Sequence, residues 1–328
     1  MQRIPVIIIG AGQAGLAMSH CLAAHDVDHA VFERGQVAER WRTERWDSLR
    51  LLTPNWMSRL PGWSYQGSDP DGFMTASQFT NYLGAYAQAS GAPIETGVEV
   101  QAVRHTPWGY VVETNRGTRL SEAVIIATGH CDVPAVPAMA RNLPAWIKQL
   151  TPSEYRNPGK LPDGGVLVVG ASATGVQLAE EIQRSGRQVT IAVGRHTRLP
   201  RSYRGRDIWY WLEQLGMLDD PASTISDLRR ARAQPSFQLV GHPDGRTIDL
   251  GTLGNLGVRL LGRAVAGANG TIFVQNDLPE TVAAAQAGLE RLLARIDVIA
   301  NAADAPLQDD AAPLMALSSW RCLDDVAA

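Results

Sequence analysis

The sequence predicts an α/β protein that contains two copies of a βαβ unit. Two segments of the 328-residue chain share one pattern, Pro5–Ser19 and Val166–Ala179. Each has a short apolar run, then a glycine-rich turn, then small residues with helical spacing. Continuous apolar runs are typical of strands buried on both faces of a parallel sheet. Because the two copies lie far apart in the sequence, we expect two Rossmann-like dinucleotide-binding domains rather than a solenoid.

Length and composition are those of an ordinary globular protein with about two domains. Hydrophobic residues make up 45% of the chain and charged residues 19%, and the net charge is -3. This balance offers no basic surface for nucleic acid, and no apolar run is long enough to span a membrane. The first residues run directly into a predicted strand, so we expect no signal peptide and a cytoplasmic location. The three cysteines, Cys21, Cys131 and Cys322, form no close pair, which argues against disulfides, a zinc site and a redox-active thiol pair.

The first glycine-rich turn has the spacing GxGxxG. Gly10 permits the tight turn after the strand, Gly12 lets the backbone approach a pyrophosphate, and Gly15 allows helix and strand to pack closely. The helix that begins around Gln13 and Ala14 then offers free N–H groups to the phosphates. In this strand–turn–helix context, the motif predicts a dinucleotide site.

An acidic residue ends the second predicted strand of this copy. Glu33 follows Ala30–Phe32, roughly 20 residues beyond the turn, where an acceptor for ribose hydroxyls belongs. The alternative is a glycine turn that binds no ligand and a solvated Glu33. We favour the ADP half of FAD as the ligand, and we include the neighbouring Arg34 and the strand residue Val100 among the residues expected to contact FAD.

The second copy differs at its middle glycine and at the end of its second strand. Ser172 stands at the middle position, and the strand ends in Gly194-Arg-His-Thr-Arg198 without an acid. A guanidinium binds a 2′-phosphate in bidentate fashion, whereas a carboxylate would repel it. This copy therefore favours NADPH over NADH, although a solvated basic turn is the alternative. The residues expected to contact NADPH are Gly170, Ser172, Ala173, Thr174, Gly175, Arg195, His196 and Arg198.

The rest of the chain supplies the remaining elements of two domains. Residues 36–75 are rich in Trp, Arg and Pro and are expected to be irregular, and residues 77–90 have the spacing of an amphipathic helix with Ser77 as N-cap. Residues 96–128 alternate as strands, and 130–165 are rich in proline, as in a connection between domains. The expected divisions are an FAD-binding domain at 1–160, an NADPH-binding domain at 161–300, and a weakly structured tail at 301–328.

Together these segments resemble the class B flavoprotein monooxygenases, which include flavin-containing monooxygenases, Baeyer–Villiger monooxygenases and related bacterial NAD(P)/FAD-dependent oxidoreductases. The resemblance runs from residue 5 to about 300 and rests on both glycine-rich turns, on Trp41–Pro54 and on an Ala-Thr-Gly segment. It implies that a set of side chains lies along the flavin, namely Trp41, Arg42, Leu51 and Thr53. It also implies that Ala127, Thr128 and Gly129 form the crossing from the FAD domain to the NADPH domain.

Two departures from the family pattern leave alternatives open. The family sequence FxGxxxHxxxY/F before the second turn is matched here only by Tyr155, because Ala145, Ile147 and Thr151 stand at the Phe, Gly and His positions. The late Gly-Asp segment of the family is not visible either, so a C-terminal truncation or a reading-frame change near residue 305 is expected.

The resemblance implies an NADPH-dependent FAD oxidoreductase that inserts one oxygen atom from O₂ into a small organic substrate through a C4a-(hydro)peroxyflavin. No side chain stands out as a catalytic acid or base, and no metal is expected. An NADPH:flavin electron-transfer reductase or oxidase is one alternative, and a truncated, non-catalytic dinucleotide-binding protein is another. The sequence specifies neither the substrate nor the oligomeric state.

Overall fold

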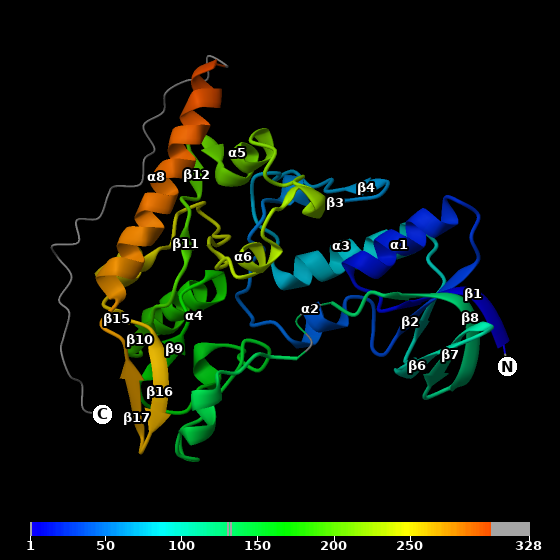
Figure 1. The fold of residues 1–328 in the computed structure, drawn as a ribbon, viewed down its shortest axis with the longest axis horizontal. Coiled ribbons are helices and arrows are strands. Elements are labelled where there is room, and N and C mark those ends of the chain that lie inside the picture. The colour runs from blue at the N-terminus through cyan, green and yellow to red at the C-terminus, as the bar shows by residue number, and fades with distance from the viewer. Residues whose placement is uncertain (1, 130, 132, 303–328) are drawn as a thin grey trace. The chain divides into compact units, whose positions relative to one another are not determined.

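The computed structural model describes residues 2–129, 131 and 133–302, which belong to two compact units (Figure 1). Among the described residues, unit 1 comprises those of 2–70, 74–136 and 150–156, and unit 2 comprises those of 71–73, 137–149 and 157–302. Within the described ranges, no helix is both long enough and apolar enough to cross a membrane. The expectations for residues 303–328 lie outside the described residues, and the functions assigned to the two predicted domains stay predictions.

A six-stranded sheet in the order β5-β2-β1-β8-β7-β6 forms the centre of unit 1. The four strands β5, β2, β1 and β8 are parallel, and the hairpin of β6 and β7 continues the sheet in antiparallel fashion. The apolar run of β1 places it at the centre, because its side chains are covered on both faces. The strands are β1 (Gln2–Ile9), β2 (His29–Glu33), β5 (Ile94–Thr96), β6 (Val100–Thr106), β7 (Gly109–Thr114) and β8 (Gly117–Ile126).

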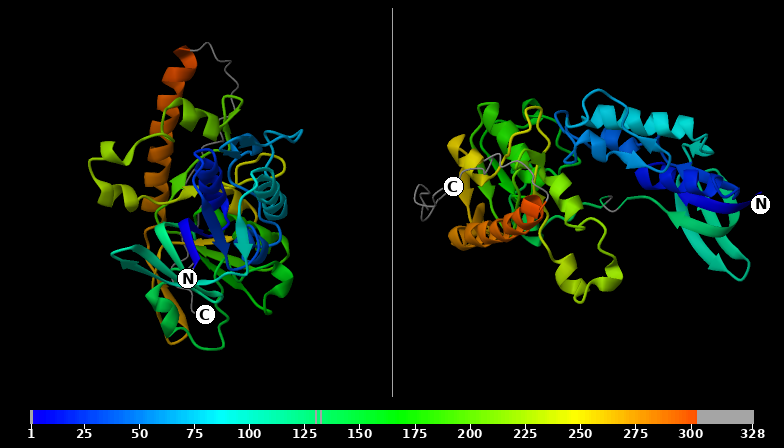
Figure 2. Two further views of the ribbon diagram at one scale, coloured as in Figure 1. Left: turned by 90° about the vertical axis from the view of Figure 1, so that its right-hand side faces the viewer. Right: turned by 90° about the horizontal axis from the view of Figure 1, so that it is seen from above.

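Two helices, α1 (Gln13–Ala23) and α3 (Ala76–Ala89), cover one face of this sheet (Figure 2). Leu16 from α1 and Leu83 from α3 are fully buried in one apolar cluster with residues of β1 and β2. The opposite face buries Ile7 and Phe32, which follow the alternation of a strand. The predicted α/β class is confirmed, with a parallel, Rossmann-like sheet at the expected place.

The N-cap of α3 corrects one expectation. Thr75, not Ser77, is the N-cap: its hydroxyl accepts the N–H of Gln78 at 3.2 Å, and the Gln78 side chain accepts the N–H of Thr75 at 2.8 Å. This reciprocal capping box satisfies two N–H groups at the helix start, which Ser77 inside the first turn does not do.

The segment expected to be irregular contains short elements held by side chains. These are α2 (Glu39–Thr43), the 3₁₀ turn η1 (Asn55–Met57) and the small hairpin of β3 (Arg59–Leu60) and β4 (Trp63–Ser64). The buried Asn55 amide donates to the carbonyl of Asp69 and accepts the N–H of Met74, both at 2.8 Å. Asn55 therefore fixes this loop, which carries much of the pocket described below.

Unit 2 is built around a three-stranded parallel sheet in the order β15-β10-β9. Its βαβ unit consists of β9 (Val166–Val169), α4 (Ala173–Arg184) and β10 (Val189–Ala192). The short strands β11 (Thr197–Arg198) and β14 (Phe237–Gln238) pair in parallel beyond β10. The other elements are η2 (Ala138–Asn142), η3 (Pro158–Lys160), β12 (Ser202–Tyr203), β13 (Arg206–Asp207), α5 (Ile208–Gln214), η4 (Ala222–Thr224), α6 (Leu228–Arg232), α7 (Leu250–Asn255), β15 (Arg259–Leu261), β16 (Ala264–Ala268), β17 (Thr271–Val274) and α8 (Leu278–Ala302).

Candidate functional site

The glycine-rich turn of unit 1 is sterically constrained on two sides and open on a third. A Cβ on Gly15 would lie 1.9 Å from the carbonyl oxygen of Gly10, so helix α1 approaches the turn as closely as only glycine allows. Gly10 has φ +108°, and a Cβ there would lie 2.6 Å from the carbonyl oxygen of Ala127. Apart from its two chain neighbours, no described residue has an atom within 4 Å of a Cβ built on Gly12. The open side is therefore where a pyrophosphate can meet the backbone.

The carboxylate of Glu33 is tied to this turn. Glu33 is 8% exposed; one oxygen accepts the N–H of Ala11 at 2.8 Å and the other accepts the N–H of Gly35 at 2.9 Å. Two backbone donors fix the carboxylate at the end of β2 and leave lone pairs for a further donor. This geometry matches an acceptor for ribose hydroxyls beside the turn.

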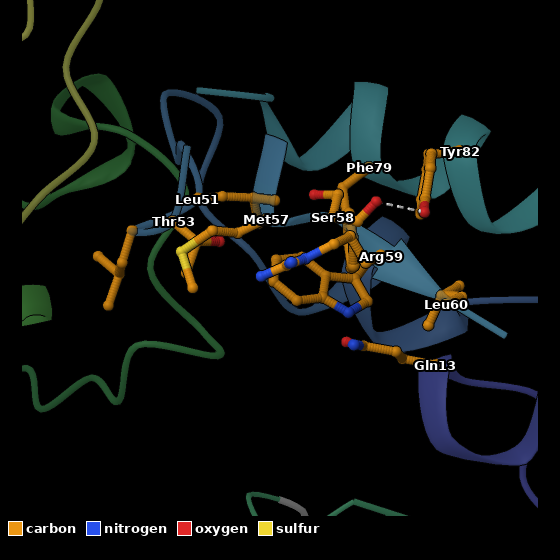
Figure 3. A pocket seen from close by; sticks show the side chains of 11 residues that line it. Gln13, Leu51, Thr53, Met57, Ser58, Arg59, Leu60, Phe79 and Tyr82 are labelled. Atoms are coloured by element: carbon orange, nitrogen blue, oxygen red, sulfur yellow. Dashed lines mark hydrogen bonds between the residues drawn. The ribbon is translucent and has the colours of Figure 1, made fainter. Parts of the chain in front are cut away.

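A pocket of about 340 Å³ lies beside the same turn (Figure 3). Four of the residues expected at FAD line it together: Gln13 at the start of α1, Trp41 from α2, and Leu51 and Thr53 from the loop that follows. A volume of this size lies at the lower end of the range for small-molecule sites. The remaining lining residues, which the sequence did not single out, are Leu52, Met57, Ser58, Arg59, Leu60, Phe79 and Tyr82.

Aromatic side chains form one wall of the pocket. Phe79 packs edge-on against Trp41 with ring centroids 4.7 Å apart and stacks on Tyr82 at 5.9 Å. The Tyr82 hydroxyl donates to the carbonyl of Ser58 at 2.7 Å, which Figure 3 shows as a dashed line. Burial, together with Tyr86, raises the pKa of Tyr82 to about 12, so its hydroxyl stays a neutral donor. Among the lining residues, Arg59 alone carries a charge at neutral pH.

Helical spacing explains why part of this wall was missed. Phe79 and Tyr82 are three residues apart and share one face of α3. The sequence predicted the helix and its apolar face, but that pattern does not distinguish a core from a pocket wall. The residues of β3 belong to no sequence motif. Their position at the pocket depends on the loop that Asn55 holds, so the sequence did not indicate it.

The other residues expected at FAD have different surroundings. The Nε of Arg42 donates to the carbonyl of Val37 at 3.1 Å, and Val100 packs into the apolar cluster that contains Phe32. The N–H of Ala127 donates to the carbonyl of Ile9 at 2.9 Å, which places the start of the expected crossing beside the turn. Arg34, Thr128 and Gly129 are exposed. The structure thus brings Ala127 to the glycine turn and packs the partly buried Val100 against the core.

The turn of unit 2 repeats the close approach seen in unit 1. A Cβ on Gly175 would lie 1.9 Å from the carbonyl oxygen of Gly170, the same distance as in the first copy. Ser172 is the N-cap of α4, and its side chain makes no capping hydrogen bond. The hydroxyl of Ser172 and the backbone N–H groups of Ala173 and Thr174 can therefore face a phosphate at this helix start.

The three residues expected to contact NADPH at the end of β10 lie in different environments. Arg195 is exposed, and its Nη2 donates to the carbonyl of Ala233 at 3.4 Å. Arg198 forms an ion pair with Asp249 at 2.7 Å and also donates to Gln286. His196 is 6% exposed, its Nδ1 lies 3.1 Å from the carbonyl oxygen of Gly194, and burial lowers its pKa. Of the three, Arg195 offers its guanidinium most openly to an anion.

Comparison with known proteins identifies the family to which this chain belongs. The pyridine nucleotide-disulphide oxidoreductase family matches residues 7–214, which include both glycine-rich turns. The chain belongs to this family. An uncharacterized CzcO-like oxidoreductase of Geobacillus kaustophilus is 38% identical over 67% of this chain and 63% of its own length. The chain thus matches less than two thirds of that relative.

Some of the proteins similar to this chain carry monooxygenase names. The rice indole-3-pyruvate monooxygenase YUCCA1 is 31% identical over 57% of this chain and 47% of its own length. A flavin-containing monooxygenase from Stenotrophomonas maltophilia has a similar fold, with a TM-score of 0.57, 22% identity, and coverage of 84% of this chain and 77% of that structure. The predicted resemblance to flavin monooxygenases is confirmed, and the prediction of an oxidoreductase is confirmed at the level of the family.

Proposed function

We propose that unit 1 binds FAD. The observation that supports this most directly is the pocket beside the first turn, where Gln13, Trp41, Leu51 and Thr53 meet. The turn and the helix start would hold the pyrophosphate, Glu33 would accept from the ribose, and the aromatic pocket would receive the ring system. The open space at Gly12 fits this assignment, because a ligand can reach the backbone there.

Unit 2 binds NADPH in this proposal. The start of α4 would hold the pyrophosphate, and the exposed guanidinium of Arg195 would bind the 2′-phosphate. His196 stays neutral, because burial lowers its pKa, and so adds no charge at neutral pH. Arg198, which is paired with Asp249, holds the strand end rather than the ligand.

The complete activity proposed is that of an NADPH-dependent flavin monooxygenase acting on a small organic substrate with O₂. Bound FAD supplies the redox chemistry, and the protein's part is to orient the dinucleotides and to keep water from the ring. The aromatic pocket wall would serve the second role, since Trp41, Phe79 and Tyr82 line the pocket and the Tyr82 hydroxyl is already bound to the carbonyl of Ser58. The names of the monooxygenase relatives support oxygen insertion over electron transfer alone.

Three measurements test this proposal in sequence. Purified protein, with FAD added, should show flavin absorbance near ~450 nm and should be bleached by NADPH in the absence of O₂. Bleaching by NADH should be slower by roughly tenfold or more, as expected for loss of one charge-assisted contact. With O₂ and a panel of amines, thioethers and ketones, an oxygenated product should form. Failure to bind FAD overturns the whole proposal, and stoichiometric peroxide without an oxygenated product replaces the monooxygenase by a reductase or oxidase.

A further inference from the structure

A buried glutamine outside every motif touches the second glycine-rich turn. Gln238 on β14 is 1% exposed, and its Nε2 donates to the carbonyl oxygen of Ala171 at 2.8 Å. Ala171 lies between Gly170 and Ser172, in the turn that precedes α4. The peptide held by this hydrogen bond therefore directly precedes the helix start proposed to meet the phosphates.

The equivalent position in unit 1 is held in another way. The carbonyl oxygen of Ala11 accepts the backbone N–H of Ala38 at 3.1 Å, and the N–H of Ala11 is bound by Glu33. In unit 2 a side chain replaces the backbone donor at the corresponding carbonyl. The two turns share their glycine geometry, but unit 2 takes this contact from Gln238, which lies 67 residues along the chain from Ala171.

The rest of the Gln238 side chain shows which contact orients it. Its buried Oε1 has no hydrogen-bond partner among the residues that the structure describes. An acceptor without a hydrogen bond does not orient its side chain, and leaving it buried costs free energy. The oxygen of Gln238 therefore does not hold the amide in place. The bond to Ala171 is therefore the polar contact that fixes the side chain.

Strand pairing connects this contact to the arginine end of the same site. In the register of β11 and β14, Gln238 lies opposite Arg198, and Phe237 lies opposite Thr197. Gln238 thus bridges the turn at the pyrophosphate end and the segment that follows Arg195. A displacement of the turn or of the arginine segment would move the other, because the paired residues of β11 and β14 connect them.

We propose that Gln238 is a positioning residue for the dinucleotide site of unit 2. It orients the peptide at Ala171 so that the N–H groups at the start of α4 and the guanidinium of Arg195 meet one NADPH molecule together. The inference rests on the proposed function, because it assigns the ligand of unit 2 from that proposal. It adds a side chain that neither the glycine motif nor the arginine segment contains.

Gln238→Met tests the inference, because methionine keeps the length of the side chain and removes the donor. Gln183→Met is the matched control: Gln183 also binds two backbone groups of unit 2, the N–H of Val189 and the carbonyl of Leu256, but it does not touch the turn. Titration calorimetry of FAD-loaded protein with NADP⁺ should show affinity lower by roughly tenfold for Gln238→Met and unchanged for Gln183→Met. FAD affinity should be equal in both variants and the wild type.

Gln238→Glu gives a second readout in case the methionine variant folds poorly. An ionised carboxylate presents only acceptors to the Ala171 carbonyl, whereas the protonated acid can donate to it. We therefore take the ratio of the NADP⁺ affinity of Gln238→Glu to that of Gln183→Met at each pH. This ratio should rise towards one as the pH falls. Hydrogen exchange without ligand should also show faster exchange at residues 172–175 in both Gln238 variants than in the control.

The possible outcomes distinguish failure of this inference from failure of the proposal that unit 2 binds NADPH. If wild-type protein binds FAD but no NADP⁺, the assignment of unit 2 fails and the inference falls with it. If wild type binds NADP⁺ and Gln238→Met binds it equally well, with unchanged exchange at the turn, the proposed function stands and the positioning role is wrong. Equal losses in Gln238→Met and Gln183→Met would show a purely structural role and would also overturn it.

Discussion

The two glycine-rich turns share one backbone geometry but have different surroundings. In both, the third glycine leaves 1.9 Å between a built Cβ and the carbonyl of the first. In unit 1, β1 lies between β2 and β8, and Gly10 is backed by Ala127. In unit 2, β9 pairs with β10 alone among the described residues, and apart from its chain neighbours no described residue has an atom within 4 Å of a Cβ on Gly170. The glycine spacing therefore encodes the approach of helix to strand, and the surrounding elements decide how firmly the turn is held.

Charge is the second difference between the units. The first turn is tied to the carboxylate of Glu33 through Ala11, whereas the strand end of the second carries Arg195 and a buried His196. A carboxylate suits ribose hydroxyls and a guanidinium suits a phosphate. Variants at matched positions of the two units should consequently separate FAD binding from NADPH binding.

The largest effect is expected at the third glycine of each turn. Gly15→Ala and Gly175→Ala each force a methyl group against a backbone carbonyl, which should destabilise the affected unit by about 1–3 kcal/mol or more. Gly15→Ala should abolish FAD binding, and Gly175→Ala should abolish NADP⁺ binding while FAD remains. Absorbance of the purified protein and calorimetry with NADP⁺ measure the two losses.

Gly12→Ala is the control, because apart from the chain neighbours its methyl group meets no described atom within 4 Å. It should leave the melting temperature of the apoprotein within error of wild type and still weaken FAD binding. If Gly12→Ala binds FAD normally, the open side of the turn does not face the ligand and the comparison between the units loses its basis.

A substitution at Glu33 should have the next largest effect. Glu33→Gln places an amide NH₂ opposite one of the two backbone N–H groups that the carboxylate now accepts, and it removes the charge. FAD affinity should fall by roughly 10–100-fold, as for loss of a charge-assisted hydrogen bond. Glu95→Gln on the neighbouring strand β5 serves as control. NADP⁺ affinity that falls as far as FAD affinity would contradict the assignment of Glu33 to the first site alone.

The sequence predicted the parts of the site that depend on local geometry. The turns, the strand ends and the grouping of Trp41, Leu51 and Thr53 follow from short-range pattern and resemblance, and the structure brings these three residues together at one pocket. It did not predict Gln238, whose position depends on the pairing of the distant short strands β11 and β14. It also did not predict Arg59, whose place in the local β3–β4 hairpin depends on the loop that Asn55 holds. It also did not show that Arg198 is paired with Asp249, 51 residues away.

The two arginines of unit 2 should respond differently to substitution. Arg195→Ala should lower NADP⁺ affinity by about tenfold and leave NAD⁺ affinity unchanged, because only the 2′-phosphate loses its partner. Arg198→Ala leaves Asp249 without its cation and should instead destabilise the protein by about 1–3 kcal/mol. Melting curves and calorimetry with both dinucleotides distinguish the two effects. If folded Arg198→Ala loses its preference for NADP⁺ over NAD⁺, the 2′-phosphate binds Arg198 and the assignment to Arg195 is wrong.

The smallest expected effect concerns the pH dependence of unit 2. Burial is the main cause that lowers the pKa of His196 below its ordinary value of 6.5, and Arg198 adds to it. The unfolded chain then binds a proton at a pH where the folded protein does not, so stability is lost as the pH falls from about 6.5 towards the lowered pKa. His196→Gln, which does not titrate, should flatten the fall in melting temperature between pH 7 and pH 5, whereas His25→Gln on the exposed surface of unit 1 should not. An unchanged pH profile in His196→Gln would mean that His196 has the same pKa in the folded and unfolded states, which would contradict a pKa lowered by burial.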